Sequence, residues 1–80
     1  MSDQVIPTIK KGTYRHNKSG NLYNVLGVAL ETETDEAVVV YHPLYKHDFG
    51  YELFTRPYGM FTDTVELDGQ KKLRFEYIGD

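Results

Sequence analysis

The spacing of apolar residues is what most constrains the fold of this 80-residue chain. No window of ten residues carries them at intervals of three and four, as an amphipathic helix requires. Short runs rich in β-branched and aromatic residues instead alternate with clusters of Gly, Asn, Asp and Pro, a pattern typical of strands joined by turns. The sequence therefore predicts an all-β fold without a long helix.

Five or six antiparallel strands are expected from these runs. The strongest covers residues 21–30, where apolar residues on both faces indicate a buried central strand and Gly27 indicates a bulge. A four-residue turn at 17–20 would pair Tyr14 with Tyr23, a favourable aromatic pair across the first hairpin. The other predicted strands cover residues 13–16, 37–41, 52–56, 64–67 and 73–78, with an edge strand at 5–9.

The final hairpin has two candidate registers around the Asp-Gly pair at 68–69. A two-residue loop, the common choice for Asp-Gly, would set Val65 against a lysine. A three-residue loop at 68–70 pairs Val65 with Leu73 and keeps Phe75 on the same apolar face, so we expect the three-residue loop.

One short 3₁₀ turn is expected at 58–61, where Met60 and Phe61 would plug one end of a barrel. The strands and this turn predict a small, partly open, SH3-like or Tudor-like barrel. We expect residues 1–11 to form a partly flexible N-terminal segment and residues 12–80 to form a single β-barrel domain.

Composition narrows the classes of function. The net charge is −3 and the pI is near 5.5, which argues against non-specific nucleic-acid binding because such binding depends on Lys and Arg. The absence of cysteine excludes disulfides and thiolate metal sites. We find no signal-peptide pattern and no apolar stretch that could span a bilayer, so a cytoplasmic location without membrane contact is expected.

Motifs spread over residues 12–77 form a combined pattern. They include Gly12-x-Tyr14-Arg15-His16, Tyr23-x-Val25-x-Gly27, Thr32-Glu33-Thr34, Arg56-Pro57, Met60-Phe61 and Arg74-Phe75. This pattern resembles the bacterial family known as domain of unknown function 1653. The resemblance implies a coherent small β domain and brings no activity with it. Two positions depart from the family: Ser19 lengthens the first turn, and Phe54 stands where the family usually has Trp.

Aromatic residues near Arg56 predict a ligand cleft. Its walls would be Tyr41, Tyr45, Phe54 and Tyr58. Aromatic walls suit peptides, nucleotide-like groups and cations. The alternative, that Tyr41 and Phe54 belong to the core, is equally compatible with the sequence. Strand alternation puts Arg56 on the same side as Phe54, at the mouth of the barrel.

Arg15 and His16 end the first predicted strand and could hold a phosphate or a carboxylate, because a guanidinium offers two parallel donors. The alternative is a solvated hairpin tip. Glu33 lies in an acidic turn and could pair with Arg15 or Arg56. That turn could also bind a hard cation, but its spacing matches no metal loop, so we expect a solvated turn, no metal site and no cofactor.

A catalytic role has little support in the sequence. His42, His47 and Asp48 could supply a general base, but a mobile polar loop is the favoured interpretation. No cysteine is present, and the two serines are poorly placed as nucleophiles: Ser2 is near the terminus and Ser19 is in a hairpin tip.

These features favour a non-enzymatic binding module for a protein, a peptide or a nucleotide-like ligand, acting as a monomer or weak homodimer. The alternatives are a small His/Glu-dependent hydrolase and a homo-oligomerising structural domain. The predicted ligand-binding residues are Arg15, His16, Glu33, Tyr41, Tyr45, Phe54, Arg56 and Tyr58.

Overall fold

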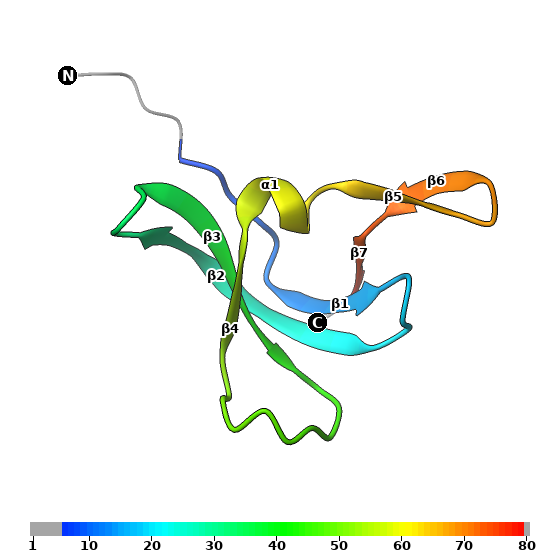
Figure 1. Cartoon of the computed structure of the whole chain (residues 1–80), viewed down its shortest axis with the longest axis horizontal. Coiled ribbons are helices and arrows are strands. Elements are labelled where there is room, and N and C mark those ends of the chain that lie inside the picture. The colour runs from blue at the N-terminus through cyan, green and yellow to red at the C-terminus, as the bar shows by residue number, and fades with distance from the viewer. Residues whose placement is uncertain (1–5, 80) are drawn as a thin grey trace.

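The computed structural model describes residues 6–79 and is built almost entirely of β-strands (Figure 1). Five strands form one antiparallel sheet in the order β4-β3-β2-β1-β7, and β5 and β6 form a separate hairpin. The elements in chain order are β1 (Gly12–His16), β2 (Leu22–Glu31), β3 (Glu36–Pro43), β4 (Phe54–Pro57), α1 (Tyr58–Phe61), β5 (Thr64–Leu67), β6 (Gln70–Leu73) and β7 (Phe75–Gly79). The predicted all-β fold is confirmed, and the barrel is open because β4 and β7 end the sheet without pairing to each other.

The first hairpin has the predicted register. Tyr14 lies opposite Tyr23, and the His16 amide donates to the Asn21 carbonyl at 2.8 Å. The predicted bulge is also present, since the pairing of β2 with β3 shifts by one residue between Val25 and Gly27. Gly27 has a φ of +153°, which a side-chain-bearing residue rarely adopts.

The expectation that β2 is buried on both faces is wrong. Val25 is 1% exposed, but Leu26 is 43% and Leu30 57% exposed. The physical reason is that the sheet forms a single curved layer, so only its inner face is covered by α1 and by its own curvature (Figure 1). Apolar residues on the outer face remain at the surface.

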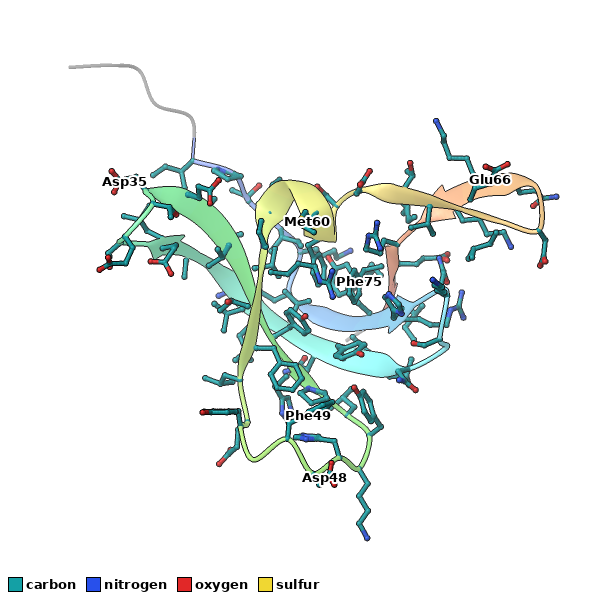
Figure 2. The ribbon with its side chains drawn as sticks, in the orientation of Figure 1. Asp35, Asp48, Phe49, Met60, Glu66 and Phe75 are labelled. Atoms are coloured by element: carbon teal, nitrogen blue, oxygen red, sulfur yellow. The ribbon has the colours of Figure 1, made fainter. Side chains whose placement is uncertain are left out.

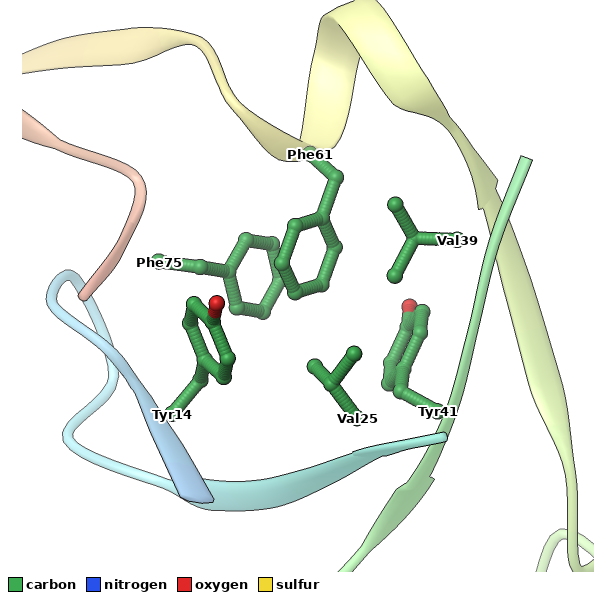
Figure 3. Packing of buried hydrophobic residues seen from close by; sticks show 6 residues of the cluster. All are labelled: Tyr14, Val25, Val39, Tyr41, Phe61 and Phe75. Carbon is green, nitrogen blue, oxygen red and sulfur yellow. The ribbon is translucent and has the colours of Figure 1, made fainter. Parts of the chain in front are cut away.

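The core is a compact aromatic cluster on the inner face of the sheet (Figure 3). The rings of Phe61 and Phe75 are stacked with centroids 4.1 Å apart and planes within 5° of parallel. Its buried members are Tyr14, Val25, Val39, Tyr41, Phe61 and Phe75. These residues come from β1, β2, β3, α1 and β7, so the cluster joins the strand at one end of the sheet to the helix that follows the strand at the other end.

The turn at 58–61 differs from the prediction. It is one turn of α-helix and not a 3₁₀ turn, because the Thr62 amide donates to the Tyr58 carbonyl four residues earlier, at 3.0 Å. Phe61 is buried in the core as expected, whereas Met60 is 50% exposed and plugs nothing. Within residues 6–79, no helix is long and apolar enough to cross a membrane.

The predicted edge strand at 5–9 is wrong for residues 6–9, which form no strand, while Val5 lies outside the described residues. This segment runs beside α1 instead of a sheet edge, and the Tyr58 hydroxyl donates to the Thr8 carbonyl at 2.8 Å. Pro7 has no amide hydrogen to give to a ladder, which is consistent with this path.

The predicted register of the final hairpin is wrong. The loop has two residues, Asp68 and Gly69, both with positive φ, and Val65 pairs with Lys72. The predicted register required one continuous strand from Leu73 through Phe75, but the chain bends between them. Leu73 ends β6 in the small hairpin, whereas Phe75 begins β7 in the main sheet, so the two need not share a face.

The β5–β6 hairpin, which we call the arm, projects from the main sheet (Figure 1). All residues of β6 are exposed, and those of β5 are exposed or half-buried. Because no residue of the arm is fully buried, setting Val65 against a lysine costs little, and the preference of Asp-Gly for a two-residue loop decides the register.

Candidate functional site

Three basic side chains from distant parts of the chain lie close together, and two of them contact the Phe75 ring. We call His16, Arg56 and Arg74 the cationic cluster. His16 ends β1, Arg56 lies in β4, and Arg74 occupies the bend between β6 and β7. The ring centroids of His16 and Phe75 are 4.8 Å apart, and the Arg56 Cζ lies over the Phe75 ring at 5.4 Å from its centroid. Figure 2 shows Phe75 near the centre of the molecule, between α1 and β1.

The register of β4 explains why Arg56 faces inward. Arg56 pairs with Val39, and Phe54 pairs with Tyr41. Directly opposite residues in a sheet share a face, and both Val39 and Tyr41 are buried in the core. The predicted placement of Arg56 on the side of Phe54 is therefore confirmed.

Arg74 reaches the cluster through backbone bonds at the bend. Its amide donates to the Asp63 carbonyl at 2.9 Å, and its carbonyl accepts from the Asn17 amide at 3.0 Å. These two bonds join the bend at the base of the arm to the segment that follows α1 and to the turn between β1 and β2. Arg74 is thus fixed beside the inner face of the sheet although it belongs to no strand.

The two arginines lack hydrogen-bond acceptors where they are most buried. The Nε atoms of Arg56 and Arg74 are both buried and have no partner among the described residues. Arg74 has one distant carboxylate, with its Nη2 3.9 Å from Asp63 Oδ2, and Arg56 forms no ion pair with any residue of 6–79. A buried donor without an acceptor typically costs about 1–3 kcal/mol, and more when charged, so each Nε–H favours the arrival of an acceptor.

The positive field of the two arginines acts on His16. Burial lowers the pKa of His16 below its ordinary value, and nearby positive charges lower the pKa further. These charges belong to Arg56, Arg74 and Lys18. The Nδ1 of His16 is 2.9 Å from the Ser19 hydroxyl, which fixes the orientation of the ring. An anion beside the arginines would weaken this field and favour the charged imidazolium.

Arg15 does not join the cluster, although it was predicted as a site residue together with His16. Strand alternation turns Arg15 to the outer face, where its Nη2 is 3.1 Å from Glu76 Oε1 and its Nε donates to Asn17 at 3.0 Å. The guanidinium of Arg15 therefore has its hydrogen-bond acceptors on the outer face of the sheet. The predicted pairing of Glu33 with Arg15 or Arg56 does not form within residues 6–79.

Glu33 lies in the exposed turn between β2 and β3, close to Asp35, which Figure 2 shows at the tip of that hairpin. Its amide donates to the Glu31 carboxylate at 2.8 Å, a local turn bond. The residues that the structure describes contain no group of three or more His, Cys, Asp or Glu side chains arranged to hold a metal ion. The structure therefore separates Glu33 from the cationic cluster.

The four predicted cleft aromatics lie in different surroundings. Tyr41 is 5% exposed and belongs to the core. Phe54 packs against Tyr41 with centroids 5.9 Å apart, and it also contacts His47 and Phe49 of the 44–53 loop. Tyr58 lies on α1 against the N-terminal segment. Within the part of the chain that the structure describes, these contacts do not bring the four rings into one cleft.

Tyr45 forms a pair with Tyr23 instead. Their hydroxyl oxygens are 3.2 Å apart and their rings meet edge to face at 5.5 Å. Burial and this hydrogen bond raise the pKa of Tyr23 to about 12, so the Tyr23 phenol stays protonated at neutral pH. The nearby His47 packs its ring on Phe49 and accepts the Phe49 amide at its Nδ1, a local loop contact.

Sequence reasoning missed two members of the site, Arg74 and Phe75. Arg74 was expected inside a continuous strand, where alternation would have placed it on the face opposite to Phe75. The sequence offered no signal for this position, because Arg74 lies among other charged residues, with Lys71 and Lys72 before it and Glu76 after it.

The fold and the cationic cluster define a small, open, all-β domain with basic side chains beside an aromatic ring on its inner face. Comparison with known families adds one match: the model of the family described as "Protein of unknown function (DUF1653)" covers residues 12–77. The chain belongs to this family, as the sequence motifs indicated.

A solved structure agrees with this assignment. The crystal structure of a DUF1653 protein from Bordetella bronchiseptica is 41% identical in sequence, with a TM-score of 0.82. The match covers 89% of this chain and 88% of that chain, so the two share nearly the whole fold. No curated protein sequence matches the chain significantly.

Proposed function

We propose that this domain is a non-enzymatic binding module that holds the anionic group of its ligand, a phosphate or a carboxylate, between Arg56 and Arg74. One observation carries the proposal: two arginine Nε–H donors from distant parts of the chain are buried without an acceptor, and both arginines lie close enough to His16 to act on its charge. A peptide and a nucleotide-like molecule can both supply such a group.

The chemistry of the side chains favours binding over proton transfer. A guanidinium is protonated at all physiological pH values, so two arginines attract and orient charge but exchange no proton with a substrate. Their planar donors match the two oxygens of a carboxylate or phosphate edge. The lowered pKa of His16 would rise beside a bound anion, which favours the charged imidazolium as a third cation.

The experiment is an NMR titration that observes the arginine Nε–Hε signals directly. Inorganic phosphate and acetate are added separately to the protein at constant ionic strength. We expect the Arg56 and Arg74 signals to shift saturably with at least one of them, while the Arg15 signal stays in place. Linear, unsaturated shifts of all arginine signals would overturn the proposal, because they would report only weak screening.

Two variants make the titration specific. Arg56→Gln removes one guanidinium of the cluster and should abolish the saturable shift of Arg74. Arg15→Gln is the matched control, because Arg15 lies next to His16 in sequence but on the opposite face. Equal loss of binding in both variants would mean that net charge, and not the cluster, attracts the anion. A monomeric or weakly dimeric state and a cytoplasmic location stay predictions.

A further inference from the structure

An apolar groove adjoins the cationic cluster. It has a volume of about 240 Å³ and lies over the inner face of β1 and β7, where α1 and the N-terminal segment meet them. Residues that line it include Ile9, Tyr14, Phe61, Leu73, Phe75 and Tyr77. Phe75 belongs to both features, since its ring lines the groove and also lies under the Arg56 guanidinium.

This shared residue defines the chemistry of a ligand that would use both features. One part of the ligand must be apolar to enter the groove, and the adjacent part must be anionic to meet Arg56 and Arg74. The charges favour such a ligand specifically: the chain as a whole carries a net charge of −3, yet at this location Arg56 has no ion pair within residues 6–79, and the ion pair of Arg74 with Asp63 is long, at 3.9 Å. Charge complementarity therefore assigns the anionic part of the ligand to Phe75, and the part of the groove beside Tyr77, on the same strand, is left for the apolar part.

The backbone of β7 adds a second kind of recognition. The His16 amide donates toward β2, so by alternation the amide of the preceding residue, Arg15, faces β7. Arg15 lies opposite Glu76, whose amide and carbonyl accordingly face β1. The backbone groups of Phe75, one residue earlier, then point away from the sheet, on the side where β7 is the last strand.

The other end of the sheet is less suited to strand addition. β4 has four residues and ends at Pro57, which has no amide hydrogen to offer. β7 has five residues and contains no proline. A strand added beside β7 would also present alternate side chains to the inner face, above the groove.

From these observations we infer that the ligand is an extended peptide that adds to β7 as an antiparallel strand, with an apolar side chain in the groove and an acidic side chain at Arg56 and Arg74. The inference rests on the proposed function and names its ligand class. In the antiparallel direction the peptide runs from Gly79 toward Phe75, so the apolar residue comes first. Side chains on one face are two residues apart, which gives the order apolar-x-acidic.

The probe is the blocked peptide acetyl-Thr-Leu-Thr-Glu-Thr-amide, and its control is the reversed order acetyl-Thr-Glu-Thr-Leu-Thr-amide. We expect the first peptide to bind at least about tenfold more tightly, the ratio for one charge-assisted hydrogen bond gained. Binding should slow hydrogen exchange at the Phe75 amide and shift the Arg56 and Arg74 Nε–Hε signals. Methylating two consecutive backbone nitrogens of the probe removes at least one edge-facing donor and should abolish binding.

The outcomes separate the two proposals. If inorganic phosphate or acetate shifts the arginine signals but the peptide leaves the Phe75 amide unchanged, the peptide inference is wrong and the proposed function stands. If none of the three probes gives a saturable shift, the proposed function is wrong. Equal affinity of both peptide orders would overturn the inference, as would stronger binding of adenosine monophosphate with shifts at Leu73 and Ile9. Equal binding by Arg56→Gln would overturn the acidic part of the recognition.

Discussion

The arginines on the two faces of the main sheet differ in whether the chain supplies partners for their charge. On the outer face, Arg15 forms an ion pair with Glu76 and a hydrogen bond with Asn17, so partners for its charge come from the chain itself. On the inner face, Arg56 meets an aromatic ring, and its Nε has no acceptor within the described part of the chain. The difference teaches that Arg56, unlike Arg15, is not held by an ion pair within the described residues, as expected of a residue that binds a ligand.

The largest expected effect comes from removing the ring that supports the inner face. Phe75→Ala should destabilise the domain by roughly 3–5 kcal/mol, the usual range for a buried phenylalanine. Phe75 stacks on Phe61 and contacts His16, Tyr23 and Tyr41, so the cavity left behind would open the centre of the core. Urea or thermal unfolding followed by circular dichroism measures the loss.

The matched control is Ile78→Ala in the same strand. Ile78 is 44% exposed, so its truncation should change the free energy of unfolding by about 0.5 kcal/mol or less, as at most surface positions. If the two variants unfolded alike, the distinction between an inner and an outer face of β7 would be wrong.

A smaller effect is expected from Arg56→Gln. The variant loses a cation–π contact worth about 0.5–1 kcal/mol but also removes a buried donor without an acceptor, so the two changes offset. We expect the free energy of unfolding to change by less than about 1 kcal/mol. A loss of several kcal/mol would make Arg56 a structural residue and would remove the contrast with Arg15.

The pKa of His16 reports the same contrast without reference to stability. Arg56→Gln should raise the pKa of His16, because it removes one of the positive charges that lower it. Arg15→Gln should leave this pKa nearly unchanged. The measurement is the pH dependence of the His16 ring signals in NMR spectra, and equal shifts in both variants would contradict the assignment of Arg56 to the inner site.

The stability of the domain should depend on pH through His16. Its folded-state pKa lies below the unfolded value of about 6.5, so the native state binds fewer protons in this range. The contribution to stability is present above pH of about 6.5 and is lost as the pH falls through the lowered folded-state pKa. Unfolding curves between pH 8 and pH 5, at ~0.5-unit intervals, test this for His16→Gln against the parent; the variant should show a flatter dependence.

Local sequence patterns made much of this arrangement predictable. The length of the turn at 17–20 predicted the Tyr14–Tyr23 pair, a glycine in the middle of a strand predicted the bulge at Gly27, and alternation predicted that Arg56 lies on the side of Phe54. The family resemblance was likewise readable from motifs along the chain. These features depend on contacts close in sequence, so the sequence carried enough information for them.

The rest depends on where a strand stops. Nothing in the residues 73–75 distinguishes one continuous strand from two strands separated by a bend. The bend is set by the backbone bond from Arg74 to Asp63, a partner in another part of the fold. Once that bond is known, the two-residue loop of the arm and the position of Arg74 in the cationic cluster can both be explained. Sequence alone also left open whether Tyr41 is core or cleft, because alternation gives a side of the sheet and not a depth.

The smallest expected effect belongs to the outer face. Arg15→Gln should change the free energy of unfolding by about 0–1 kcal/mol, the range measured for solvent-exposed ion pairs. The side chains of Arg15 and Glu76 are 44% and 46% exposed, so water and salt screen their attraction. Any loss should therefore shrink further when unfolding is repeated in ~1 M salt.

Glu76→Gln completes the test, because it removes the carboxylate and keeps the side-chain length. If the only role of Arg15 is its ion pair with Glu76, then Arg15→Gln, Glu76→Gln and the double variant should have nearly equal stability. A larger loss in Glu76→Gln would reveal a further role, since Glu76 also accepts a hydrogen bond from Asn17, whose side chain donates to the Leu73 carbonyl at the root of the arm. Glu76 on the outer face would then stabilise, through Asn17, the bend that positions Arg74 on the inner side. The arrangement of the inner arginines would in that case depend on contacts of the outer face.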